Sequence, residues 1–126
     1  MIVGVGIDAV EIARVERMLD SKGERVRRRL FTEAEASYSI DKAKPAQHLA
    51  ARIAAKEAAF KALSGTEEAR AIGWREMEII RQPDGRPGLL FHGRAADRAA
   101  ELGVRRAWVS MTHTDLIATA VVVLEA

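Results

Sequence analysis

One segment constrains this chain more than any other, residues 50–63, which read AARIAAKEAAFKAL. Alanine, leucine, lysine, glutamate and arginine are strong helix formers, and no glycine or proline interrupts residues 46–64. Pro45 stands at a favourable first helical position, and Gly65 is a plausible stop. The pattern predicts one long helix.

This predicted helix has no polar face. At about 100° per residue, Leu49, Ile53, Phe60 and Leu63 form one apolar arc, and alanines occupy the opposite side. Both sides are therefore expected to pack against other elements. Charged groups beside buried apolar surface need partners. The charged residues in question are Arg52, Lys56, Glu57 and Lys61.

The helix alone leaves two interpretations open. Three cations beside one carboxylate suit a site for a polyanion with a divalent metal. They also suit an ion-paired helix edge whose lysine stems reach outward to solvent.

Length and composition bound the remaining choices. A chain of 126 residues predicts a single domain over residues 1–126, with a core small enough that oligomerisation would help it. The absence of cysteine excludes disulfides, thiol catalysis and cysteine-ligated metals, and it fits a reducing, cytoplasmic location. The net charge of +2 and an aromatic content of 5% argue against nucleic acid as a partner.

Neither a signal peptide nor a membrane segment is expected. The first eight residues have no basic region and already contain Asp8. No apolar run approaches membrane-spanning length.

Periodicity and turn signals give the order β-α-α-α-β-β-α-β-β. The two hairpins expected late in the chain favour an α+β fold with an antiparallel sheet packed against helices. Thr32 and Glu35 have the form of a capping box for the second helix. The expected segments are a buried strand at 1–7, helices at 9–19 (broken or ended by Gly23), 33–40 and 46–64, a strand at 74–81, a turn at 82–87, a strand at 89–91, a helix at 94–102 and strands at 105–113 and 116–124, the last buried.

Asp8 is expected to close the first strand. An acid at that position either caps the following helix or binds a metal ion, and both roles stay open.

Residues 14–29 carry seven basic residues against three acids. Such a run is either a solvated helix face or a docking surface for an acidic partner.

Five segments resemble, in order and spacing, the holo-[acyl-carrier-protein] synthases, the short bacterial type of 4′-phosphopantetheinyl transferase. These segments are GIDAVEI at 6–12, FTEAE at 31–35, RIAAKEAAFKAL at 52–63, DGRP at 84–87 and SMTHT at 110–114. The resemblance covers nearly the whole chain. It implies transfer of 4′-phosphopantetheine from coenzyme A to a serine of acidic apo-acyl carrier protein in fatty acid biosynthesis. It further implies a Mg²⁺ cofactor and a homotrimer with active sites between subunits.

The resemblance also assigns roles to residues. Asp8 and Glu57 match the metal ligands of the family, and Lys61 matches the group that acts on the reacting diphosphate. Glu57 or Glu35 matches a carboxylate near the attacking serine, and the identity of the general base stays open. The residues that match coenzyme contacts are Arg52, Lys56, Lys61, Ser64, Gly65, Gly85, Arg86, Pro87, Ser110, Thr112 and His113. The residues that match the carrier-protein docking face are Arg14, Arg17, Met18, Lys22, Arg25 and Arg28. His48 and His92 match nothing and are expected to be surface or structural residues.

Two alternatives compete with the transferase. Another magnesium-dependent enzyme acting on a nucleotide diphosphate would need the same cations and acids but not the basic helix. A non-catalytic adaptor for acidic proteins would need the basic helix alone.

Overall fold

The computed structural model describes residues 1–40 and 42–126, and within them the predicted α+β order is confirmed. A three-stranded antiparallel sheet has the order β1-β5-β4, and β2 and β3 form a separate antiparallel hairpin. The strands are β1 (Ile2–Glu11), β2 (Met77–Arg81), β3 (Pro87–Phe91), β4 (Arg106–His113) and β5 (Ile117–Glu125). The helices are α1 (Ile12–Leu30), α2 (Glu33–Ile40), α3 (Pro45–Ala62) and α4 (Gly93–Glu101), with short 3₁₀ turns η1 (Glu68–Ala71) and η2 (Trp74–Glu76).

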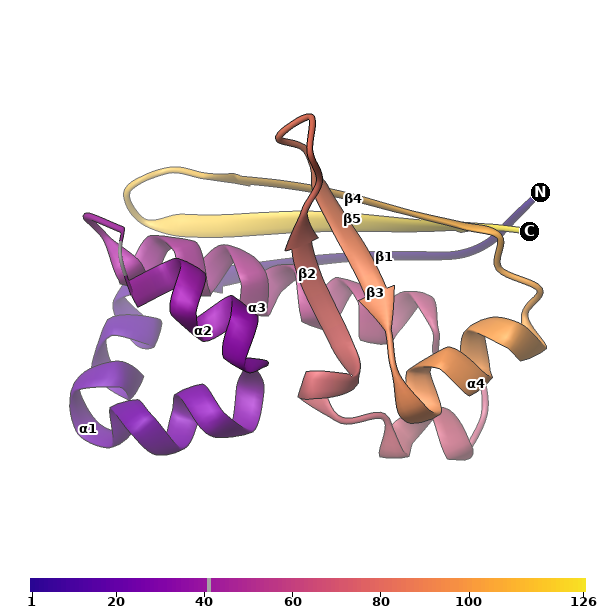
Figure 1. The fold of residues 1–126 in the computed structure, drawn as a ribbon, viewed down its shortest axis with the longest axis horizontal. Coiled ribbons are helices and arrows are strands. Elements are labelled where there is room, and N and C mark those ends of the chain that lie inside the picture. Colours follow the sequence, from indigo (N-terminus) through magenta and orange to yellow (C-terminus); the bar gives the residue numbers. More distant parts are fainter. Residues whose placement is uncertain (41) are drawn as a thin grey trace.

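Helix α3 is the centre of the molecule. It lies along one face of the three-stranded sheet, and α1, α2 and the β2–β3 hairpin pack against its other sides (Figure 1). The expectation that both sides of this helix are packed is confirmed, because its alanines and apolar residues are almost all buried. Pro45 occupies the first turn as predicted.

Strand β1 approaches α3 unusually closely, which explains two glycines in the strand. A β-carbon at Gly6 would lie 1.8 Å from the carbonyl oxygen of Ala58, and one at Gly4 would lie 2.2 Å from that of Ala62. Only glycine lets the two backbones meet at this distance. The contact fixes the strand against the helix turn that carries Glu57 and Lys61.

The prediction of a buried strand ending at Asp8 is wrong in two respects. Strand β1 continues to Glu11, so Asp8 lies inside it and does not cap α1. The strand is also an edge strand, in which Val5 is 57% and Ile7 67% exposed. The sequence pattern is that of a strand buried on both faces, but only the face toward α3 is covered within this chain.

Helix α1 is longer than predicted. It begins at Ile12 and runs through Gly23 to Leu30, with a kink at Lys22, whose φ of −142° and ψ of 27° are not helical. A β-carbon at Gly23 would meet nothing within 4 Å, so this glycine loosens the helix without a packing role. The predicted break is therefore present as a kink rather than an end.

The second half of the chain follows the prediction in outline. Both expected hairpins form, and the turn before β3 has Gly85 at φ +90°, as an Asp-Gly turn requires. The predicted strand at 74–81 begins only at Met77, because residues 74–76 form η2. The last strand, predicted as buried, is buried on one face only.

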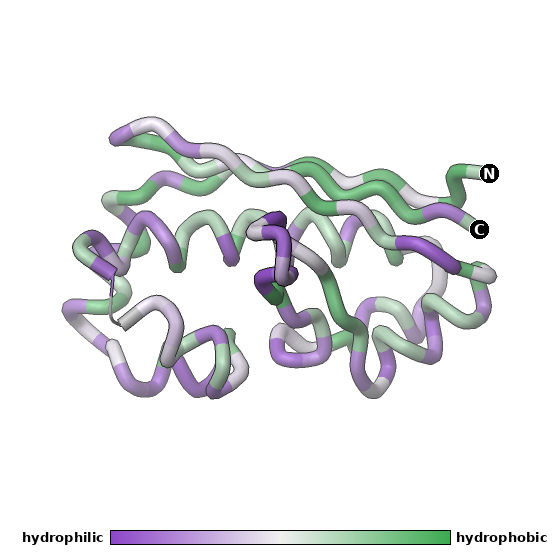
Figure 2. The backbone as a smooth tube through the Cα atoms, turned by 45° about the horizontal axis from the view of Figure 1, so that its top comes forward, coloured by the Kyte–Doolittle hydropathy of each residue, from purple (hydrophilic) through white to green (hydrophobic). Residues whose placement is uncertain are grey.

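The outer face of the three-stranded sheet is apolar and partly exposed. Figure 2 shows hydrophobic residues along the long strands, whereas α1 at the lower left carries many hydrophilic ones. Trp108 on β4 is 47% exposed, and Val5 and Ile7 of β1 are exposed on the other side of the central strand β5. Trp108 and Val5 both pair with Val123 of β5 and therefore share one face of the sheet. Within the described residues, no helix has both the length and the apolar character to cross a membrane.

Candidate functional site

Asp8, Glu57 and Lys61, predicted from β1 and α3, meet in one place. The Nζ atom of Lys61 donates hydrogen bonds to Asp8 Oδ1 at 3.0 Å and to the carbonyl oxygen of Ile7 at 2.9 Å. Glu57 lies one helical turn before Lys61, and its carboxyl group is within hydrogen-bonding reach of Asp8. The side chain of Asp8 is only 14% exposed, whereas that of Lys61 is 54% exposed.

The two carboxyl groups change each other's protonation. Partial burial and the neighbouring Asp8 carboxylate raise the pKa of Glu57 to about 7. Burial tends to raise the pKa of Asp8 as well, but its hydrogen bonds with Glu57 and Lys61 lower it overall. The pair therefore takes up one proton close to neutral pH.

This arrangement fits a divalent cation. The Oδ2 atom of Asp8 is buried and has no hydrogen-bond partner among the described residues. When Asp8 and Glu57 are both ionised, their carboxylates repel each other and this Asp8 oxygen stays unsatisfied. A proton or a metal ion bound between the two carboxylates removes both costs. No group of three or more His, Asp or Glu ligands occurs in the described part of the chain. Two carboxylates suit Mg²⁺, which keeps several waters and binds substrate phosphates.

A pocket of about 390 Å³ opens beside this cluster. Glu57, Phe60 and Lys61 from α3 line it together with Arg70 and Trp74, and a second pocket of about 440 Å³ adjoins it across Phe60 and Arg70 and includes Ser64 and Gly65. No sequence signal marked Arg70 or Trp74, because both stand in short 3₁₀ turns that produce no periodic pattern. Mixed apolar and cationic walls suit an anionic substrate with an extended organic chain.

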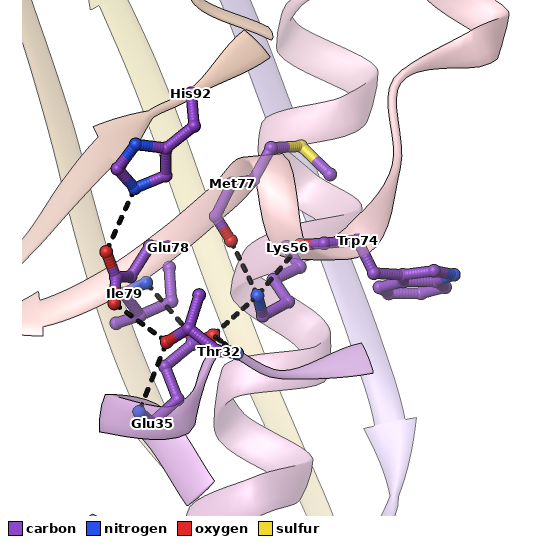
Figure 3. A network of polar contacts seen from close by, with 8 residues as sticks. All are labelled: Thr32, Glu35, Lys56, Trp74, Met77, Glu78, Ile79 and His92. Atoms are coloured by element: carbon purple, nitrogen blue, oxygen red, sulfur yellow. Dashed lines mark hydrogen bonds and ion pairs between the residues drawn. The ribbon is translucent and has the colours of Figure 1, made fainter. Parts of the chain in front are cut away.

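Lys56 and Glu35 form a buried network instead of contacting solvent. Figure 3 shows the Lys56 ammonium surrounded by three acceptors: Glu35 Oε1 at 2.8 Å and the carbonyl oxygens of Trp74 at 2.9 Å and Met77 at 2.6 Å. Both side chains are completely inaccessible to solvent. Burial lowers the pKa of Lys56, although the adjacent Glu35 carboxylate opposes this shift.

Glu35 has several partners of its own. It completes the predicted capping box, accepting from the Thr32 backbone N–H at 2.9 Å, and it accepts from the Ile79 N–H at 3.0 Å. Glu78 extends the network to Thr32 and His92. Within this chain both groups are enclosed and satisfied, and they join α2, α3 and β2. Lys56 also lines the pocket beside Glu57, and its expected coenzyme contact, like the expected base role of Glu35, stays a prediction.

Several predicted coenzyme contacts meet in another pocket, of about 200 Å³, between α3 and the two hairpins. Its lining includes Arg52, Gly85, Pro87, Thr112 and His113 from the prediction, and His48, which the sequence indicated only as a surface or structural residue. Arg86 and Ser110 face a neighbouring cleft beside Trp108. The chain therefore places the carboxylate cluster and these residues in separate pockets.

The predicted docking residues lie on α1. Arg14, Arg17, Lys22, Arg25 and Arg28 are exposed, and Met18 is half-buried. The positive charge of Arg14 opposes the raised pKa of Glu57, which places this end of α1 close to the carboxylate pair. A basic surface thus leads toward the candidate site.

The chain matches known proteins along nearly all of its length. Residues 4–121 match the model of the 4′-phosphopantetheinyl transferase superfamily. A "Holo-[acyl-carrier-protein] synthase" of Koribacter versatilis (strain Ellin345) is 46% identical over 125 residues, which are 99% of each chain. The crystal structure of holo-[acyl-carrier-protein] synthase from Neisseria meningitidis is 29% identical with a TM-score of 0.87, and covers 100% of both chains. A holo-(acyl-carrier-protein) synthase from Bacillus anthracis str. Ames, in complex with CoA (3′,5′-ADP), is 31% identical with a TM-score of 0.79, covering 100% of this chain and 98% of the other. The chain therefore belongs to the 4′-phosphopantetheinyl transferase superfamily.

Proposed function

We propose that this protein is a holo-[acyl-carrier-protein] synthase. It transfers 4′-phosphopantetheine from coenzyme A to a serine of apo-acyl carrier protein and releases adenosine 3′,5′-bisphosphate. The holo-carrier protein then serves fatty acid biosynthesis in the cytoplasm, and residues 1–126 form one transferase domain. Family membership supports this proposal, and the observation that carries it is the Asp8–Glu57–Lys61 cluster with its unpaired buried oxygen.

Asp8 and Glu57 are the residues that would hold Mg²⁺. When bound, the ion neutralises charge on the diphosphate of coenzyme A and stabilises the charge that develops at the β-phosphorus. The serine oxygen forms a bond to that phosphorus while the bond to the bridging oxygen of adenosine 3′,5′-bisphosphate breaks. Lys61 is exposed enough to donate a hydrogen bond to this oxygen as it becomes negative.

The serine proton also needs an acceptor. The enclosure of Glu35 in the buried network favours Glu57 for this role. Glu57 lines the open pocket beside Lys61 and accepts the proton through a water molecule that it holds.

The complete site is proposed to form between subunits of a homotrimer. The outer face of the sheet exposes three large apolar side chains, those of Val5, Ile7 and Trp108, and exposed apolar surface of this kind suits contact with another subunit. The carboxylate cluster and the pocket with Thr112 and His113 are separate within one chain. A second copy supplying that pocket next to Asp8 would bring both sets of residues to one coenzyme molecule.

The proposal is tested by incubating the purified protein with apo-acyl carrier protein, coenzyme A and Mg²⁺ and measuring the mass of the carrier. We expect a gain of one phosphopantetheine, its loss when Mg²⁺ is chelated, and its loss in Glu57→Gln. The matched control is Glu33→Gln, which changes an exposed glutamate on α2. Light scattering during gel filtration measures the oligomeric state, for which we expect three copies.

The outcomes separate the alternatives. A carrier of unchanged mass, with coenzyme A hydrolysed in the absence of carrier protein, would favour a nucleotide-diphosphate hydrolase. Binding of the carrier with no change in coenzyme A would favour an adaptor. Transfer by a monomer would contradict only the composite site.

A further inference from the structure

Tyr38 is the centre of a group of cations that the proposed function has not used. The Nη1 atom of Arg81 donates a hydrogen bond to Tyr38 Oη at 2.6 Å. The guanidinium carbon of Arg52 lies 4.6 Å from the ring centre, and Lys42 Nζ lies 4.3 Å from it. His48 meets the ring edge-on at a centroid distance of 6.2 Å.

These cations are not neutralised by ion pairs that the described residues form. Neither Arg52 nor Arg81 belongs to any such pair. Arg52 is 6% exposed, and its Nε atom has no hydrogen-bond partner in the described part of the chain. Burial lowers the pKa of Arg52, and the Glu35 carboxylate opposes this shift, but Glu35 is already paired with Lys56. A buried arginine in this state is costly unless a further negative group completes it. An aromatic ring face supplies part of the missing stabilisation, and a bound anion supplies the rest.

The cations also share one cavity. Tyr38, His48, Arg52 and Arg81 line the pocket of about 200 Å³ that His113 closes from β4. Burial, together with the charges of Arg52, Lys42 and His113, lowers the pKa of His48, which is the expected result of positive groups crowded without an anion. This pocket does not contain the carboxylate pair, so the phosphate it suits is not the reacting diphosphate.

We propose that Tyr38 is a positioning residue that holds Arg52 and Arg81 in place to bind the 3′-phosphate of coenzyme A. The proposal rests on the proposed function for the identity of the ligand. The ring fixes Arg52 through its face and the hydroxyl group fixes Arg81, so both guanidinium groups are oriented before the coenzyme arrives. Preorganised donors lose less conformational freedom on binding than free arginine side chains do.

Two variants separate the contributions of the ring and the hydroxyl group. Tyr38→Phe keeps the ring contacts with Arg52 and Lys42 and removes the bond from Arg81, so we expect about a threefold higher KM for coenzyme A. Tyr38→Leu removes both, and we expect about a tenfold higher KM with kcat within about twofold of the wild type. Dephospho-coenzyme A lacks the 3′-phosphate, so with this substrate both penalties should fall to about twofold or less.

A spectroscopic measurement gives a second, independent test. Tyr38 is the only tyrosine in the chain, so phenolate absorbance reports on it alone. Partial burial raises the pKa of Tyr38, but the hydrogen bond from Arg81 and the charges of Arg81 and Lys42 lower it overall. His48 and Arg52 from α3 and His113 from β4 face the same pocket. Adding adenosine 3′,5′-bisphosphate should move the titration of Tyr38 upward, because the anion offsets these charges.

Wild-type transfer activity confirms the proposed function separately from these results. Unchanged KM in both Tyr38 variants, or an equal loss with coenzyme A and dephospho-coenzyme A, would overturn the positioning role. So would a Tyr38 titration that adenosine 3′,5′-bisphosphate does not shift. If circular dichroism shows that Tyr38→Leu does not fold, the test is calorimetric binding of adenosine 3′,5′-bisphosphate to Tyr38→Phe. We expect about threefold weaker binding than in the wild type. Wild-type affinity would contradict the positioning role.

Discussion

Replacing Gly6 by alanine should disturb both stability and catalysis through one contact. The added β-carbon would lie 1.8 Å from the Ala58 carbonyl oxygen, about 1.6 Å short of the 3.4 Å at which ordinary contact begins. The atom it meets belongs to the backbone of α3, which cannot move aside as a flexible side chain can. Strand β1 must therefore shift away from the helix.

The shift of β1 should lower both the folding free energy and the catalytic rate. Overpacking of this kind costs about 1–3 kcal/mol of folding free energy. Asp8 lies two residues after Gly6 in β1, while Glu57 precedes Ala58 in α3, so the shift also separates the two carboxyl groups. A misplacement of about 1 Å in a catalytic arrangement can cost about 100-fold in rate, and we expect a loss of that order in kcat/KM.

Urea denaturation measures the first effect and the carrier mass assay the second. The matched control is Gly23→Ala, where the added carbon meets nothing within 4 Å and lies in helix α1. Alanine in a helix is favoured over glycine by about 1 kcal/mol, so the control should be at least as stable as the wild type. Wild-type stability and activity in Gly6→Ala would refute the close β1–α3 contact and the positioning of the site by it.

Three further predictions concern charges. The pKa of Glu57 is raised from 4.5 to about 7, so the metal-free protein should lose about 1 kcal/mol of stability, after discounting for solvent screening, as pH rises from 4.5 through 7. Mg²⁺ should therefore raise the melting temperature more above pH 7 than below it. Equal Mg²⁺ effects at both pH values would contradict the shared proton. Lys56→Met should cost about 3–5 kcal/mol in urea denaturation because it leaves Glu35 buried without its partner, and adding Glu35→Gln should recover part of this loss; strictly additive losses would argue against the pair. Arg14→Glu should raise the KM for apo-acyl carrier protein about tenfold at low salt and less at high salt, whereas the same change at exposed Arg105 should not; an equal effect of both would mean that only net charge matters.

Local signals predicted the parts of the fold that local interactions decide. The second helix has the predicted bounds because Thr32 and Glu35 form the capping box written in the sequence. The Asp-Gly turn forms because glycine is needed at the positive φ of residue 85. Strand β1 was misjudged because its apolar residues face both sides, and sequence cannot tell whether the second side is covered by this chain or by another copy.

The charges of α3 show the same limit at the level of single residues. Arg52 and Lys56 are four residues apart, and so are Glu57 and Lys61. The second pair is displaced from the first by five residues, which is about 140° around the helix. Lys56 faces α2 and β2, where it ends in a dry ion pair with Glu35, and Lys61 faces β1, where it remains half-exposed beside Asp8. The ion-pair interpretation is confirmed for Lys56, although its ammonium group ends in a buried pair and does not reach solvent. The polyanion interpretation stays a prediction for Glu57 and Lys61. Periodicity gives the angle between the two faces, but only the tertiary partners decide that one face ends in a buried ion pair while the other stays open to solvent beside a second carboxylate.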